Sequence, residues 1–267
     1  MTVFGCIMAA SGITLDEVQN LSFDSVYSTT AGSLYAIHRN PAGLGIVDEE
    51  RQILGHCVRW YDAPLTGAGL SFLDATTELG SLALGLTYWN GRGDVDDNEF
   101  NYNLSYALEL PWEVKGPVYL GAGIELVNSD LTDEDKLRVR AGALKPLLVA
   151  NIPMNFGFVI RNIGTGNGPR PLTFEFGVGA RLLDEELEVM ADAIIPVENE
   201  SAIKLGAAYT YQGRFIFRGN AYLLSCDATG FSLGAGMRLL VDHEINVDYG
   251  YNDAARGRFG ISALARF

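Results

Sequence analysis

The sequence has few cysteines, few cationic residues and no long apolar run, and each shortage excludes a class of protein. The 267 residues include three cysteines, Cys6, Cys57 and Cys226, whose spacing provides neither a zinc-ligand pattern nor an even disulfide framework. Lysine and arginine total 19 against 33 acidic residues, and the net charge of −14 argues against nucleic acid as a partner. No run of about eighteen apolar residues is present, so no transmembrane helix is expected.

Motifs for catalysis and metal binding are also scarce. The three histidines are His38, His56 and His243, and no nucleophile motif such as Gly-x-Ser-x-Gly occurs in the sequence. The acidic stretch 94–99 begins like a calcium loop but lacks its glycine and its final glutamate, and we interpret it, like 130–135, as a solvated loop. We therefore expect no catalytic residue, no metal site and no cofactor.

Glycine and aromatic residues are plentiful, and apolar residues recur at every second position along most of the chain. In the last ten residues, one face of an expected strand carries Phe259, Ile261, Ala263, Ala265 and Phe267. An exposed terminal strand of this kind invites pairing with other chains, and closure into a barrel removes the unpaired edge.

The same alternation predicts about fourteen strands. They lie near 52–61, 65–73, 81–90, 98–110, 117–127, 136–147, 152–162, 172–183, 186–195, 201–211, 214–223, 230–240, 243–251 and 257–267. An even number of antiparallel strands suits a transmembrane barrel with both termini on one side, and loops of alternating length agree with it. We predict an all-β transmembrane antiparallel β-barrel with a short N-terminal helical plug segment; a soluble β-sandwich is the alternative. Aromatic residues near strand ends favour the barrel because they resemble interfacial girdles, as at Trp60, Trp89, Tyr61, Tyr211 and Tyr251.

Three regions follow from this interpretation. Residues 1–12 resemble the end of a secretory signal peptide without its basic start, or form an ordinary apolar N-terminal segment. Residues 13–51 are the expected plug segment, in which 30–44 predicts a short helix stopped by Asn40-Pro41 and followed by a glycine turn. Residues 52–267 form the expected barrel.

Charged residues of both signs alternate with the apolar ones, so we expect them to face the barrel interior. We interpret them either as an ion-pair network that joins the wall to the plug or as a substrate path. They are Arg59, Glu109, Glu125, Arg138, Arg140, Arg161, Glu175, Arg181, Glu188, Asp192, Lys204, Arg218, Arg238, Glu244, Asp248 and Arg258. The same alternation directs His56 toward lipid or the rim.

Three stretches carry a resemblance to known families. Residues 33–44, SLYAIHRNPAGL, resemble the segment before the first strand of FadL-type, PorV/PorQ and UPF0164-like outer-membrane proteins. Residues 156–164, FGFVIRNIG, and the final hairpin at 244–267 are also similar to these families. The glycine-rich run that usually precedes the first motif is reduced here to residues 28–32.

The resemblance implies a fourteen-stranded barrel in the bacterial outer membrane whose N-terminal segment enters the lumen. Asn40, Pro41, Ala42 and Gly43 would then position a gating plug, or simply end a helix and turn the chain. Phe267 would be the terminal aromatic recognised by the barrel-assembly machinery. The expected partners are outer-membrane lipid, this machinery and a protein bound at the loops.

The function expected from the resemblance is transport of small hydrophobic compounds, without enzymatic activity. The alternative is a non-transporting barrel that acts as a structural or type IX secretion partner. Short acidic loops favour the alternative.

Overall fold

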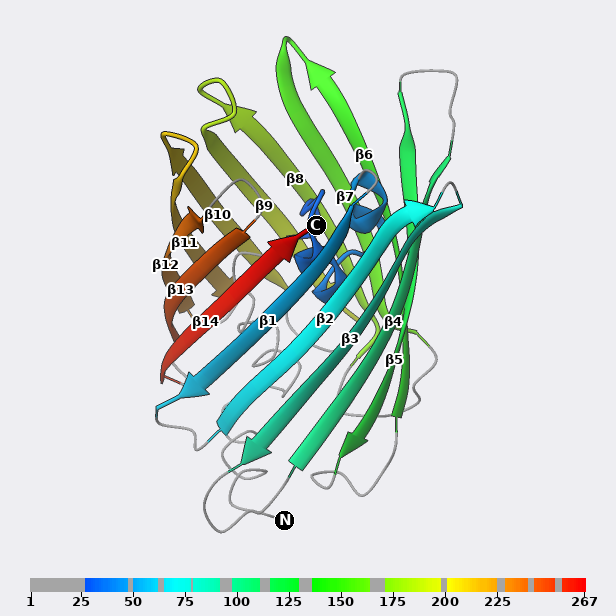
Figure 1. The fold of residues 1–267 in the computed structure, drawn as a ribbon, viewed down its shortest axis with the longest axis vertical. Coiled ribbons are helices and arrows are strands. Elements are labelled where there is room, and N and C mark those ends of the chain that lie inside the picture. The colour runs from blue at the N-terminus through cyan, green and yellow to red at the C-terminus, as the bar shows by residue number, and fades with distance from the viewer. Residues whose placement is uncertain are drawn as a thin grey trace.

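The computed structural model shows a closed antiparallel β-barrel (Figure 1). It describes residues 27–47, 50–61, 65–77, 79–91, 98–110, 116–129, 136–163, 171–197, 201–224, 229–239, 243–252 and 256–267. The expected signal remnant, residues 13–26 of the expected plug, and the acidic stretches 94–97 and 130–135 lie outside these ranges. Within them, no helix has the length and apolar character needed to cross a membrane.

Fourteen strands form the wall, and the expected fold class is confirmed. Each strand pairs with its neighbours in sequence, and the last strand pairs with the first, which excludes the sandwich alternative. The strands are β1 (Arg51–Trp60), β2 (Leu65–Thr77), β3 (Gly80–Gly91), β4 (Asn98–Leu110), β5 (Val118–Ser129), β6 (Lys136–Val149), β7 (Ile152–Ile163), β8 (Thr173–Leu182), β9 (Leu187–Pro196), β10 (Ala202–Tyr211), β11 (Phe215–Leu224), β12 (Thr229–Leu239), β13 (His243–Asn252) and β14 (Arg256–Arg266).

One end of the barrel carries short turns, and the chain's last residue lies there. Ala150 and Asn151 join β6 to β7 and both have positive φ, at 49° and 66°, which matches the right-handed twist of a tight hairpin. Short connections at this end are typical of the periplasmic side of an outer-membrane barrel. We call this end the periplasmic mouth.

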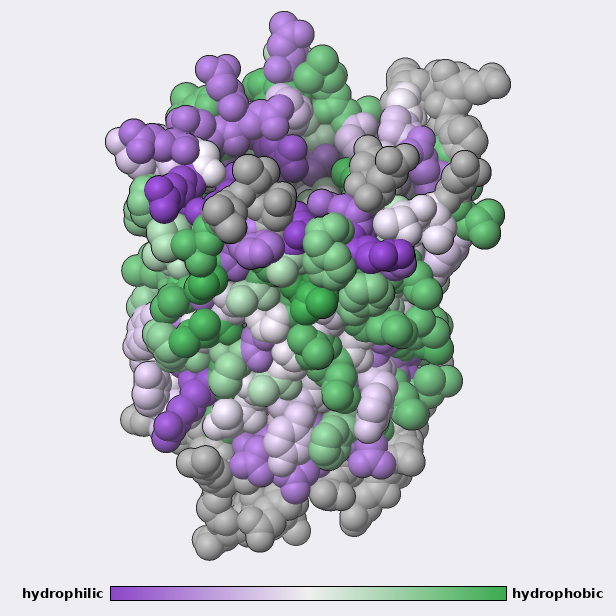
Figure 2. All heavy atoms as spheres, in the orientation of Figure 1, coloured by the Kyte–Doolittle hydropathy of each residue, from purple (hydrophilic) through white to green (hydrophobic). Residues whose placement is uncertain are grey.

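The outer face of the wall is apolar. Large exposed side chains alternate with buried ones along most strands, as with Tyr102, Leu104 and Tyr106 on β4 or Phe231 and Leu233 on β12. Figure 2 shows these apolar residues gathered across the middle of the molecule, with hydrophilic residues concentrated above them. An apolar band between polar ends is the surface that a lipid bilayer requires.

Residues 27–47 lie inside the barrel, and we call them the lumen segment (Figure 1). They contain two short 3-10 helices in place of the single helix that the sequence predicted. The helix η1 (Leu34–His38) is capped by the Ser33 side chain, and η2 (Pro41–Ile46) is capped by that of Asn40. The first helix ends before Pro41 as expected, but Pro41 then begins the second one, because a proline is well tolerated in the first turn.

The lumen segment also explains an error in the predicted orientation of β1. Arg59 is exposed on the outer face, whereas His56 faces inward and contacts the ring of His38. The inner face of β1 packs on an apolar part of the lumen segment, so it carries Leu54 and Val58 where a water-filled barrel would carry polar residues.

Two tryptophans predicted to lie in the interfacial girdle are instead inside the barrel. Trp60 and Trp89 are both buried, and Trp89 covers Gly67 on the adjacent strand. Tyr61, Tyr211 and Tyr251 are exposed near strand ends, as a girdle requires. Cys57 is a free cysteine exposed on the outer face of β1.

Candidate functional site: the occupied lumen

The strongest contact between the lumen segment and the wall is a buried cluster of charges around Arg39. Its Nε lies 2.9 Å from a carboxylate oxygen of Glu175 on β8 and 3.5 Å from one of Asp192 on β9. Arg161 on β7 makes an ion pair with the second oxygen of Glu175. All four side chains are buried, so each charge depends on the others for compensation.

Residues at the start of the lumen segment extend this cluster. Ser28 donates from its backbone N–H and from its hydroxyl to the two carboxylate oxygens of Asp192, at 2.8 Å each. The Tyr27 hydroxyl donates to Asn220 at 2.7 Å, and the Lys204 ammonium lies 4.4 Å from the centre of the Tyr27 ring. The segment is therefore held by β8 through β11 with polar and charged contacts.

The sequence Asn-Pro-Ala-Gly at 40–43 has a structural role in this arrangement. The Asn40 side chain accepts from the backbone N–H of Ala42 and donates to the backbone carbonyls of Ser28 and Ala143, at 2.6 and 3.2 Å. One amide thus caps η2, ties two parts of the segment together and binds β6. Gly43 lies so close to the carbonyl of Thr30 that no side chain fits there.

Inward-facing glycines allow the segment to lie directly on the wall. A Cβ atom added at Gly121 would collide with the backbone of Pro41 and Ala42, and one added at Gly142 would collide with the Asn40 side chain. These two inward-facing glycines therefore provide space for the segment.

A second charged contact lies at the neighbouring strands β5 and β6. Arg140 on β6 donates to the backbone carbonyl of Ile37 at 2.8 Å and lies 3.2 Å from Glu125 on β5. Arg138 is 3.7 Å from the same carboxylate oxygen. The Arg140 guanidinium thus supplies a hydrogen-bond donor to a backbone carbonyl near the end of η1.

The segment also shares an apolar core with the inner face of the wall. Leu34, Ile37 and Leu44 are fully buried against side chains from β1, β2, β3, β4 and β14. The wall residues of this cluster are Leu54, Leu73, Ala75, Ala83, Ala107 and Leu264. Burying three large aliphatic side chains contributes roughly 1.5–3 kcal/mol each to docking of the segment.

His38 and His56 meet at the edge of this core, with ring centres 5.5 Å apart. Burial lowers the pKa of His38 well below its ordinary value, and the nearby His56 and Arg140 lower it further. His38 is therefore neutral when the segment is docked. His243 is exposed at the start of β13, two strands from β1 in the strand order of the barrel.

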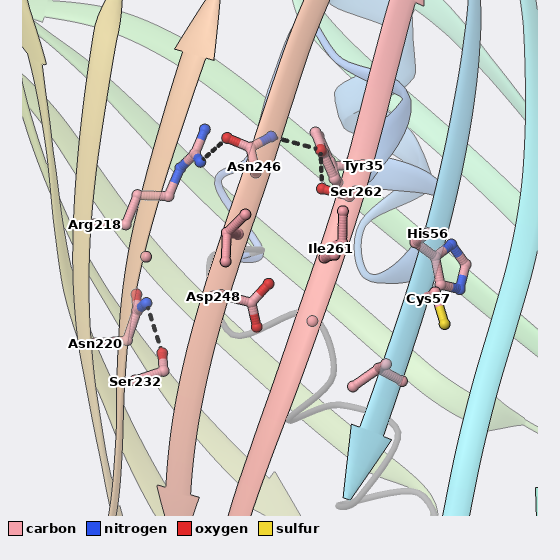
Figure 3. A pocket seen from close by; sticks show the side chains of 14 residues that line it. Tyr35, His56, Cys57, Arg218, Asn220, Ser232, Asn246, Asp248, Ile261 and Ser262 are labelled. Carbon is pink, nitrogen blue, oxygen red and sulfur yellow. Dashed lines mark hydrogen bonds between the residues drawn. The ribbon is translucent and has the colours of Figure 1, made fainter.

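A small internal pocket lies beyond Tyr35, between the segment and strands β11 to β14 and β1 (Figure 3). The Tyr35 hydroxyl lies 2.8 Å from that of Ser262 and accepts from the Asn246 side chain at 3.0 Å. Arg218 donates to Asn246 and, at 2.7 Å, to Glu244. This hydrogen-bond network joins the lumen segment to β11, β13 and β14.

On the periplasmic side of that network is a larger cavity of about 430 Å³. It lies between the lumen segment and the inner wall from β8 to β14. Arg181, Glu188, Arg218, Arg238 and Glu244 contribute its charges, and Ile46, Met190, Ile216 and Leu264 contribute apolar surface. The volume is typical of a site for a small molecule.

The structure thus places the charges that were predicted to face the interior in four different locations. Those brought against or near the lumen segment are Glu125, Arg138, Arg140, Arg161, Glu175, Asp192 and Lys204, and those lining the cavity are Arg181, Glu188, Arg218, Arg238 and Glu244. Asp248 and Arg258 pair with each other at 2.8 Å, farther toward the other mouth. Glu109 is exposed near the end of β4, and Arg59 lies outside.

Sequence reasoning did not identify Ser28, Tyr35, Arg39 and Asn246 as site residues. The positive charge of Arg39, in the middle of an otherwise apolar stretch, was a usable signal because such a charge requires a buried partner. Nothing in the sequence indicated that Tyr35 would meet Ser262.

Comparison with known proteins shows similarity at the level of the fold. No protein-family model and no curated protein matches the sequence. The Ralstonia pickettii toluene transporter TbuX superposes with a TM-score of 0.64 at 12% identity, over 93% of this chain and 96% of its own. The Pseudomonas putida toluene transporter TodX gives 0.62 at 12% identity, over 90% and 94%. The Acinetobacter baumannii outer membrane protein Omp33 gives 0.56 at 11% identity, over 83% and 99%.

These similarities concern the fold: at 12% identity they include structures described as toluene transporters, and the PorV, PorQ and UPF0164 part of the resemblance is not shown. Together with the closed wall and its apolar outer face, they confirm the expected location. The fold is that of a bacterial outer-membrane β-barrel.

Proposed function

We propose that the protein is a gated channel or transporter for small compounds, closed in this state by its own lumen segment. The observation that carries the proposal is the contact between Arg39 and the carboxylates of Glu175 and Asp192. The segment is held by non-covalent contacts, among them these ion pairs, so it can undock from the inner wall while it remains joined to β1, and competing charges or water would weaken the polar part of this attachment. The cavity beside it provides room for a solute.

Small hydrophobic compounds are the substrate class that the sequence resemblance implies. Two structures with the same fold are described as toluene transporters, and apolar side chains form part of the cavity lining here. We infer no enzymatic role, because the compared structures described as transporters or outer-membrane proteins give no indication of catalysis.

The second candidate is a barrel that never conducts and acts as a structural or secretion partner. The contacts of the lumen segment favour it, since they join the segment to β8 and also to the seam strands β1 and β14. The two candidates differ in what happens when the segment is removed.

Conductance in planar lipid bilayers separates them. The intact protein should give negligible current, and a variant lacking residues 14–44 should give clear, steady current. Heat-modifiable migration on a gel verifies that the variant is folded. A folded deletion variant without current would refute the channel and favour the second candidate, and large currents from the intact protein would refute closure by the segment.

A further inference from the structure

The cavity at the periplasmic mouth has an uneven charge that the closing function does not explain. Arg218 and Arg238 lie on neighbouring strands and share Glu244 as an ion-pair partner, at 2.7 and 3.8 Å. Glu188 on β9 also interacts electrostatically with Arg218, so of the two arginines Arg238 has the less compensated charge. Across the cavity, Arg181 is paired in register with Glu188 and lies 3.6 Å from Glu185.

The two arginines at Glu244 are held very differently. Arg218 donates to both Glu244 and Asn246, so its guanidinium is fixed in the network around Tyr35. Arg238 has only the long 3.8 Å contact to Glu244 and a 3.4 Å hydrogen bond to the carbonyl of Gly213, and its side chain is 39% exposed. The planar guanidinium of Arg238 thus keeps donors that can bind a carboxylate in two-pronged fashion.

Apolar side chains share the same cavity. Ile216 and Leu264 are buried members of the inner wall, and Met190 faces them from β9. A ligand that satisfies both surfaces carries one negative charge on a compact apolar body. A purely apolar ligand would leave the arginine side of the cavity without a partner, and a small inorganic anion would leave the apolar side uncovered.

We propose that this cavity is a binding site for small organic acids, with Arg238 as the residue that binds the carboxylate. The positive charge of Arg238 then attracts such acids within a chain that is acidic overall. The inference that the barrel transports these acids rests on the proposed channel function. The inference that the cavity binds them does not.

Benzoate and benzamide form a matched pair of probes, since they have the same shape and differ in charge at neutral pH. Binding is measured by equilibrium dialysis of the full chain in detergent, with radiolabelled benzoate and low salt. Benzoate should bind saturably at one molecule per barrel, and benzamide should bind at least about tenfold more weakly, because it lacks the charge-assisted hydrogen bonds. Inorganic phosphate should displace benzoate poorly, since it makes no apolar contact.

The test variant is Arg238→Gln and its control is Arg181→Gln, which removes an equal charge from the opposite side of the same cavity. Arg238→Gln should weaken benzoate binding about tenfold and make benzoate and benzamide alike, and Arg181→Gln should change it less than about threefold. Absence of saturable benzoate binding, equal binding of benzamide, equal potency of phosphate, or equal effects of the two substitutions would each overturn the proposal.

These results are independent of the conductance experiment, because binding is measured on the closed protein. If the protein binds benzoate through Arg238 but never conducts, the binding site is supported and the proposed channel function is refuted. If it conducts after removal of the segment but does not bind benzoate, the channel function is supported and the binding site is refuted.

Discussion

Replacement of Arg39 by glutamine should open the barrel. The change removes the cation that lies between the buried carboxylates of Glu175 and Asp192. Removing one partner of a buried ion pair costs roughly 3–5 kcal/mol. Because Arg161 still pairs with Glu175, we expect the lower end, about 3 kcal/mol, which makes the undocked segment roughly 150 times more populated relative to the docked one.

The measurement is open probability in planar bilayers, with gel mobility as the test of folding. Arg39→Gln should raise the open probability by about two orders of magnitude from the closed baseline. Arg51→Gln is the matched control, since Arg51 makes an exposed ion pair with Asp74 outside the lumen, and it should leave the current unchanged. The double variant Arg39→Gln/Asp192→Asn should recover part of the closure, because it also removes one uncompensated carboxylate. A folded Arg39→Gln protein as closed as the Arg51→Gln control would refute the reasoning.

Three further predictions concern other parts of the molecule. Deleting Phe267 should reduce the amount of protein recovered in outer membranes, and equal recovery would contradict its role as the assembly signal. Gly142→Val should displace Asn40 and raise the conductance, whereas Gly55→Val, at a site with open space around it, should not; equal currents would contradict direct packing of the segment on β6. Because burial depresses the pKa of His38 in the docked state, docking should weaken as the pH falls below the ordinary value of about 6.5, by up to roughly 1.4 kcal/mol per pH unit. Conductance should therefore rise between pH 7.5 and 5.5, and His38→Gln should flatten this rise; an unchanged rise in the variant would assign it to another group.

The strands could be predicted from the sequence because their outer residues face a uniform apolar solvent. One face of β4 carries Tyr102, Leu104 and Tyr106, and lipid requires this apolar face regardless of what fills the barrel. The terminal strand followed the same rule, with Ile261 outside and Leu264 inside.

The inside of the wall was less predictable because its environment changes from strand to strand. Near the lumen segment the interior is an apolar core, so β1 presents Leu54 and His56 inward, and polarity alone assigned His56 and Arg59 to the wrong faces. The ion pairs of Arg39 join residues that are distant in sequence, and only the closed wall brings β8 and β9 to the segment.

The seam between β1 and β14 has a consequence for how the protein folds. Gln52 on β1 accepts a hydrogen bond from the backbone of Leu34, while Ser262 on β14 meets Tyr35 and Leu264 enters the segment's apolar core. The two strands that close the barrel therefore pair directly over the segment. Because they share these contacts, closure of the barrel and docking of the segment stabilise each other, and loss of the segment would weaken the pairing that closes the wall.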